Sequence, residues 1–157
     1  MIMKGNIEPA QPLVLTKDQH TILGELGEIM GLIENLLIES AERVDPSVSQ
    51  KIKGQTAAGQ GPLWAKAMTG RVRDAQLAAL LPDAEREIRE VAKDRNDFVH
   101  ALFEGDYVKG YVQPGYQTTS ARRSTTGKRR PTADLQSIRD RAAKLSCLID
   151  QIAKAAI

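Results

Sequence analysis

The sequence predicts an all-α protein, a four-helix bundle with a short β-hairpin or loop insertion between the third and fourth helices. Four segments each carry apolar residues at the three- and four-residue spacing of one helix face. Aromatic residues make up only 4% of the chain, so the core must rest on Leu, Ile, Val and Ala, which favours helices over a sheet sandwich. A length of 157 residues fits a single domain.

The first helix is expected over about residues 17–43, after an irregular lead-in at 1–15. The helix is expected to end at Asp45-Pro46, because a proline ring disfavours helical backbone geometry at the residue before it. Three glycines inside the helix cost about 1 kcal/mol each relative to alanine, which suggests close approach of another helix. These are Gly24, Gly27 and Gly31. The predicted apolar face comprises Leu23, Leu26, Met30, Ile33, Leu37 and Ala41, and Glu34 borders it.

A long mobile loop is expected over residues 45–61, which are polar and contain three glycines. The second helix is expected over about residues 63–81, with a break at Thr69-Gly70. Its apolar residues are Trp64, Met68, Val72, Ala75 and Ala79.

The third helix is expected over about residues 82–103, with Pro82 at a first-turn position that tolerates proline. Residues 105–130 contain tyrosines, valines and a Pro-Gly turn signal, and they form the predicted hairpin or basic loop. The fourth helix is expected over residues 132–156. Its apolar stripe comprises Leu135, Ile138, Ala142, Leu145, Leu148 and Ile152.

The net charge of +2 does not by itself indicate nucleic-acid binding, but one stretch is strongly basic. It is either a solvated loop or a patch that binds an anion such as RNA. This basic segment comprises Arg122, Arg123, Lys128, Arg129 and Arg130.

The remaining composition favours a cytoplasmic protein without a membrane partner. The N-terminal residues lack the apolar run of a signal peptide, and no stretch approaches the roughly 18 apolar residues of a membrane span. Cys147 is the single cysteine and is expected as a small core residue. Two histidines and one cysteine at scattered positions give no metal-ligand spacing, so neither a metal nor another cofactor is expected.

The hexapeptide Arg95-Asn96-Asp97-Phe98-Val99-His100 near the end of the third helix is the strongest candidate site. Arg95 occupies a position where the helical pattern expects an apolar residue. A buried charge at this position costs free energy unless an opposite charge pairs with it or it takes part in a functional site. The stripe that Arg95 interrupts contains Ile88, Val91, Phe98 and Leu102.

An arginine and a histidine can together cleave RNA without a metal ion. The histidine can move the proton of the 2′-hydroxyl or protonate the leaving 5′-oxygen, and the arginine can stabilise negative charge on the phosphorane. Arg95 and His100 differ by roughly 140° in direction around one helix. Two copies of the chain that face each other are therefore expected to form a composite cleft. Asn96 lies four residues before His100 and can orient the imidazole or hold a phosphate.

The hexapeptide resembles the R-x(4–6)-H motif of HEPN domains (higher eukaryote and prokaryote nucleotide-binding), in which a polar residue such as Asn96 follows the arginine. The resemblance implies an all-α bundle, a homodimer and a metal-independent endoribonuclease with a role in defence or as the toxin of a toxin–antitoxin pair. It assigns Arg95 and His100 to the catalytic pair and Asn96 to the polar third position. It also implies RNA as ligand and an antitoxin or other protein as partner.

Structural interpretations of the same residues remain open. Arg95 can pair with a buried acid, for which Glu34 is the candidate, and His100 can be a histidine stabilised by the helix C-terminus. The protein would then be a non-catalytic interaction module or a nucleotide-binding module. The sequence contains no glycine-rich phosphate loop and no Ser-His-Asp arrangement that would indicate another enzyme class.

Overall fold

The computed structural model describes residues 17–103 and 132–157, with side chains placed for residues 17–98 and 133–157. The described part of the chain is all-α, and it contains no strand beyond an isolated bridge between Val72 and Ala156. Its helices are α1 (Lys17–Val44), α2 (Pro46–Lys53), α3 (Ala57–Met68), α4 (Ala75–Ala79), α5 (Leu81–Phe103) and α6 (Thr132–Ala155).

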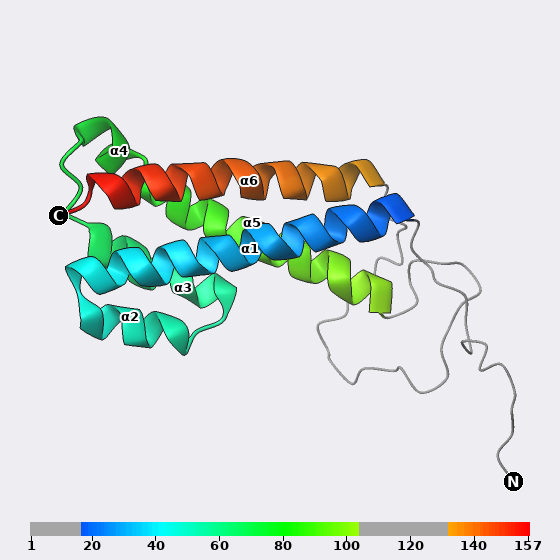
Figure 1. The fold of residues 1–157 in the computed structure, drawn as a ribbon, viewed down its shortest axis with the longest axis horizontal. Coiled ribbons are helices and arrows are strands. Elements are labelled where there is room, and N and C mark those ends of the chain that lie inside the picture. Colours follow the sequence, from blue (N-terminus) through cyan, green and yellow to red (C-terminus); the bar gives the residue numbers. More distant parts are fainter. Residues whose placement is uncertain (1–16, 104–131) are drawn as a thin grey trace, which may run out of the picture.

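The three long helices α1, α5 and α6 run along the length of the molecule, and α1 and α6 lie side by side (Figure 1). The shorter helices α2 and α3 pack against one end of this group, with α3 in contact with both α1 and α5. The long helices confirm the predicted segments 17–43, 82–103 and 132–156, with end points that differ by a residue or two. Each contributes one apolar stripe to a shared core, as the periodicity predicts.

The prediction of a long loop over residues 45–61 is wrong, because this segment forms α2 and the start of α3. Asp45 caps α2: its carboxylate accepts hydrogen bonds from the backbone N–H of Ser47 at 3.1 Å and from the Ser47 hydroxyl at 2.7 Å. Ile52 is fully buried, so α2 contributes to the core despite its polar sequence. Pro46 occupies the first turn, where its missing N–H costs nothing.

The predicted second helix over residues 63–81 is two helices, α3 and α4, separated at Thr69-Gly70. Gly70 has a φ of +77°, a left-handed conformation that glycine adopts without strain, and this ends α3. The chain then returns to the C-terminal residues. Backbone hydrogen bonds join the N–H of Arg73 to the carbonyl of Ala155 at 3.0 Å and the N–H of Ile157 to the carbonyl of Arg71 at 3.1 Å.

The close helix approach predicted from the glycines of α1 is not observed. A Cβ atom added to Gly24, Gly27 or Gly31 would meet nothing within 4 Å. The close approach occurs instead between α3 and α5, where a Cβ on Gly61 would lie 3.2 Å from Cγ2 of Ile88. The α1 glycines therefore leave open space beside the helix.

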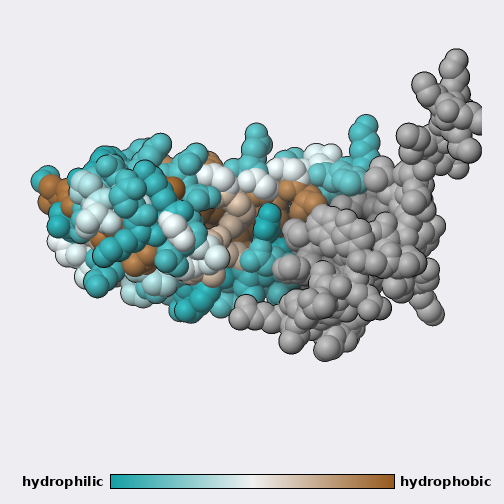
Figure 2. Space-filling view, turned by 90° about the horizontal axis from the view of Figure 1, so that it is seen from below, coloured by the Kyte–Doolittle hydropathy of each residue, from teal (hydrophilic) through white to brown (hydrophobic). Residues whose placement is uncertain are grey.

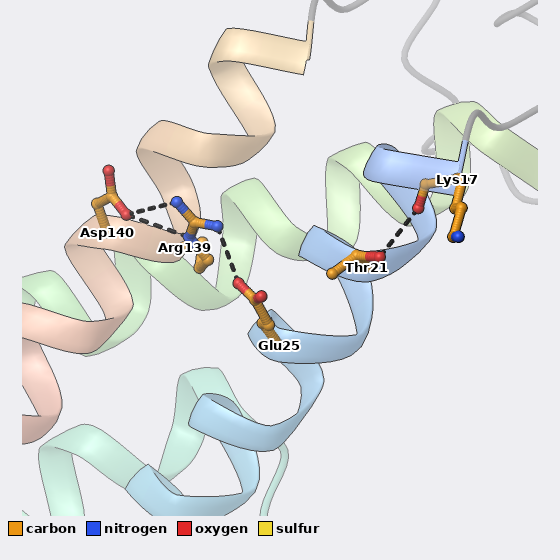
Figure 3. Close-up of polar contacts among 5 residues, drawn as sticks. All are labelled: Lys17, Thr21, Glu25, Arg139 and Asp140. Atoms are coloured by element: carbon orange, nitrogen blue, oxygen red, sulfur yellow. Dashed lines mark hydrogen bonds and ion pairs between the residues drawn. The ribbon is translucent and has the colours of Figure 1, made fainter.

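A surface ion pair connects α6 to α1. Arg139 of α6 donates to Glu25 of α1 at 2.8 Å and contacts Asp140 at 3.1 Å (Figure 3). Hydrogen bonds from the guanidinium, first to Glu25 and then to Asp140, raise the pKa of Arg139. These groups are solvent-exposed, so the pair contributes little to stability.

Several sequence predictions concern residues outside the described ranges. They include the lead-in at 1–15, the hairpin or basic loop at 105–130, and the basic segment Arg122, Arg123, Lys128, Arg129 and Arg130. The prediction that Cys147 is a core residue is wrong, because its side chain is exposed on α6.

Candidate functional site

Arg95 lies on the inward-facing side of α5, as its position in the apolar stripe predicts. Ile88, Val91 and Phe98 of the same stripe are buried, whereas Arg95 is half-buried. The side chain of Leu102 falls outside the described residues. A half-buried guanidinium within an apolar stripe needs access to solvent or to a polar partner.

A cavity beside α5 provides this access. Its volume is about 300 Å³, which is the lower end of the range of small-molecule sites. The cavity lies between α1, α3 and α5, with one lining residue from α6. It is reached from solvent, because Glu34 and Asn96 line it and are exposed. Its lining residues are Gly27, Met30, Gly31, Ile33, Glu34, Leu37, Ala57, Gln60, Ile88, Ala92, Arg95, Asn96 and Leu145.

The polar side chains of the cavity form two hydrogen-bonded pairs. On α5, Nη1 of Arg95 donates to Oδ1 of Asn96 at 2.9 Å. On the opposite helices, Nε2 of Gln60 donates to Oε1 of Glu34 at 3.1 Å. One pair carries a positive charge and the other a negative charge, and both line the same small space.

Glu34 and Arg95 therefore lie on one cavity, but they do not bond directly. Among the residues with described side chains, no hydrogen bond or ion pair joins them, and Glu34 is bonded to Gln60. Pairing of Arg95 with Glu34 through a bridging water stays a prediction. With no carboxylate in contact among the described side chains, the guanidinium of Arg95 is available to an anionic ligand.

Gln60 is a site residue that the sequence analysis missed, because residues 45–61 were predicted to form a loop. Its side chain is only 3% exposed, and its amide nitrogen also faces the carbonyl oxygens of Ile52 and Gln55, each at 3.4 Å. Gln60 thus joins α3, the end of α2 and Glu34 on α1. The alanines at positions 57, 58, 65 and 67 were the available signal for a helix.

An ion-pair network fixes α5 against α6 beside the candidate site. Nε of Arg141 donates to Glu87 at 2.8 Å, and Nη1 donates to Asp94, the residue before Arg95, at 2.6 Å. The hydrogen bond to Glu87 raises the pKa of Arg141, followed by the bond to Asp94, against the opposing effect of burial. Because Arg141 bonds residues two turns apart on α5, it holds the axial position of the helix that carries Arg95.

The other candidate residues are only partly placed. The backbone of His100 belongs to α5, which continues to Phe103, but its side chain lies outside the described residues. The structure therefore brings together Arg95, Asn96 and Glu34, and it does not relate His100 or the basic segment to them. Among the described residues, no group of three or more His, Cys, Asp or Glu side chains is arranged to hold a metal ion.

The surface around the described helices is mostly hydrophilic but has an apolar region on one side. Figure 2 shows brown and tan apolar atoms in the middle of this view, between teal hydrophilic areas. None of the described helices is both long enough and apolar enough to span a bilayer. Comparison with protein-family models, curated proteins and solved structures found no match to this chain.

Proposed function

We propose that this chain is a metal-independent endoribonuclease that resembles HEPN domains and acts as a homodimer. The observation that carries the proposal is the position of Arg95 and Asn96. An arginine that replaces a core residue of α5 lines an open cavity and has no carboxylate in contact among the described side chains. A guanidinium in this setting is suited to bind a phosphate with its planar set of donors.

In the proposed reaction the 2′-hydroxyl of RNA attacks the adjacent phosphorus, and the bond from phosphorus to the 5′-oxygen breaks. His100 transfers the proton from the nucleophile or to the leaving oxygen. Arg95 stabilises the negative charge that grows on the phosphorane oxygens, and Asn96 holds Arg95 through their hydrogen bond. Positions five residues apart on an ideal α-helix face directions roughly 140° apart, so one helix does not bring both groups to one point and we place the partner's histidine beside Arg95.

The resemblance also suggests a wider role for the protein. The basic segment Arg122, Arg123, Lys128, Arg129 and Arg130 would hold the RNA backbone by charge. A role in defence or in a toxin–antitoxin pair, with an antitoxin or other protein as partner, belongs to the same proposal.

The test is incubation of single-stranded RNA with the purified full-length chain in EDTA. We expect products that end in a 2′,3′-cyclic phosphate or its hydrolysed form, and we expect DNA of the same sequence to survive because it lacks the 2′-hydroxyl. Arg95→Ala and His100→Ala should each abolish cleavage while keeping the helical circular-dichroism spectrum. Arg89→Ala is the matched control, because Arg89 is exposed on the same helix and does not line the cavity.

Two results would contradict the proposal. The first is a folded wild-type dimer that leaves RNAs of varied sequence intact. The second is cleavage that persists at the wild-type rate in His100→Ala. Neutralising the basic segment should instead weaken RNA binding and flatten its salt dependence.

A second candidate is nucleotide binding without cleavage, and the cavity itself favours it. A space of about 300 Å³ with apolar walls and a few charged groups is typical of a small-ligand site. Binding of mononucleotides by a chain that cleaves no RNA would support this function over the first.

A further inference from the structure

The two polar pairs of the cavity present different hydrogen-bonding groups to a ligand. Nε2 of Gln60 faces three acceptors, which are Oε1 of Glu34, the carbonyl of Ile52 and the carbonyl of Gln55. This arrangement fixes the orientation of the amide and leaves its oxygen as an acceptor. Oε2 of Glu34 likewise has no hydrogen bond among the described residues. The Glu34–Gln60 pair therefore offers acceptors to a ligand, and one of them is anionic.

The Arg95–Asn96 pair offers donors. One N–H of Arg95 is used by Oδ1 of Asn96, and the rest of the guanidinium and the amide nitrogen of Asn96 make no hydrogen bond among the described side chains. These groups suit a phosphate, which accepts several hydrogen bonds and carries negative charge. A ligand that matches both pairs has N–H donors in one part and a phosphate in another.

The walls between the two pairs are small and apolar. Gly27, Gly31, Ala57 and Ala92 line the cavity, and a Cβ on either glycine would project into open space. Glycine in a helix interior costs about 1 kcal/mol relative to alanine, so the two glycines lower the stability of α1 where it borders the cavity. The cavity can hold roughly ten water molecules at their liquid volume, which is room for a flat heterocycle.

We propose that the cavity is a base-binding subsite for guanine, with Glu34 as the residue that determines specificity. Guanine is the standard RNA base whose Watson–Crick edge carries two adjacent donors, the ring N1–H and the 2-amino group, and a carboxylate accepts both. Adenine and cytosine place an acceptor nitrogen beside their amino group, and uracil places its N–H between two carbonyls. Enzymes read exposed bases through this edge.

In this arrangement Gln60 holds the carboxylate of Glu34, and Arg95 with Asn96 binds the phosphate of the same nucleotide. The inference rests on the proposed function in one respect, since that phosphate is the one at which RNA would be cleaved. It adds that cleavage occurs next to guanine.

The experiment is calorimetric titration of the full-length chain with GMP, AMP, CMP and UMP, together with cleavage of four RNAs that differ at one base. We expect GMP to bind tighter than the other three by about tenfold or more, the discrimination typical of a two-bond contact. Glu34→Gln should reduce this preference, because an amide cannot accept from both donors, and it should keep the phosphate-dependent part of the affinity. Thermal unfolding of this variant checks that loss of the bond to Gln60 has not unfolded the site.

Substitutions in the glycines of α1 give a matched pair. Gly31→Leu places a side chain in the cavity and should abolish nucleotide binding without unfolding the helix. Gly24→Leu adds the same side chain to the same helix outside the cavity lining and should leave binding unchanged.

The outcomes separate this inference from the proposed function. Equal affinity for the four nucleotides, or a GMP preference that survives Glu34→Gln, would overturn the inference even if RNA is cleaved. Selective GMP binding by a chain that cleaves no RNA would support the inference and contradict the nuclease.

Discussion

Trp64 and Ser40 form the buried polar contact that joins α3 to α1. Nε1 of Trp64 donates to the Ser40 hydroxyl at 2.8 Å, and the hydroxyl donates to the carbonyl of Leu36 at 2.5 Å. Both side chains are almost fully buried and cannot reach water. The bond therefore gives the indole N–H and the hydroxyl the hydrogen-bonding partners that they would otherwise lack. The contact fixes α3, and with it Gln60, against the helix that carries Glu34.

Removing this contact should destabilise the fold. Ser40→Ala leaves the indole N–H of Trp64 buried without an acceptor, which we expect to lower the free energy of unfolding by about 1–3 kcal/mol in urea denaturation. Ser146→Ala is the control, since among the described residues the Ser146 hydroxyl bonds the carbonyl of Ala143 in its own helix and no other group, and its loss should change stability little. An equal effect of the two substitutions would mean that the bond between helices contributes nothing.

Asp45 should make the stability of α2 depend on pH. The hydrogen bond from the Ser47 hydroxyl, aided by the N–H groups of Ser47 and Val48 and by Arg71, holds the pKa of Asp45 below its usual value of 3.8. A lowered pKa means that the ionised form favours the folded state, so this stabilisation is present above pH 3.8 and is lost as the pH falls through the folded-state pKa.

The comparison variant is Asp45→Asn, which keeps an acceptor at the cap but does not titrate. We expect the difference in unfolding free energy between wild type and variant to be constant near neutral pH and to shrink in acid. A difference that stays the same across the acid titration would contradict the assigned role of the Asp45 carboxylate.

Individual site residues were predictable only where they broke a pattern. Arg95 interrupts an apolar stripe, and this local contradiction identified the side of α5 that lines the cavity. Gln60 gave no such signal, and the α1 glycines broke the helical pattern but were interpreted as a site of close helix approach, since the role of both depends on how the helices pack. The hydrogen-bonding partner of Glu34 could not be predicted from the sequence either. Arg95 and Gln60 line the same cavity as Glu34, and only the distances in the structure show that Gln60 is the partner.

At the scale of elements, the long amphipathic helices were predictable and the short ones were not. The periodic stripes of α1, α5 and α6 each extend over several turns, which makes the helical pattern unambiguous. The segment 45–61, which forms α2 and the start of α3, is polar and contains Gly54, Gly59 and Gly61, whose low helix propensity predicted a loop. Tertiary packing outweighs this low propensity, because the helical conformation of α2 and α3 buries Ile52 and Trp64 fully in the core.

Two helical glycines, one in open space and one in close contact with another helix, should respond in opposite ways to alanine. Gly24→Ala should raise the unfolding free energy by about 0.5–1 kcal/mol, because Gly24 is exposed with open space around it and alanine favours helix. Gly61→Ala should lower it by about 1 kcal/mol or more, because its Cβ would press on the buried Ile88 at 3.2 Å and on the backbone carbonyl of Glu85 at 3.4 Å. Stabilisation by Gly61→Ala in urea denaturation would show that α3 and α5 can separate without cost.

At the scale of the whole molecule, the proposed activity requires two copies of the chain. Arg95 and His100 lie five residues apart on α5. In an ideal α-helix, positions five residues apart face directions that differ by roughly 140°. A two-fold axis that passes near α5 would bring Arg95 of one protomer close to the histidine of the other, and each dimer would then contain two equivalent composite sites.

Mixing two inactive variants tests this central claim most directly. Arg95→Ala and His100→Ala homodimers each lack one member of every site, but a heterodimer of the two contains one site with both groups intact. We expect that unfolding and refolding the variants together restores part of the wild-type RNA cleavage in EDTA, whereas each variant treated alone stays inactive. A mixture that forms heterodimers and remains inactive beside an active wild type would contradict the shared cleft.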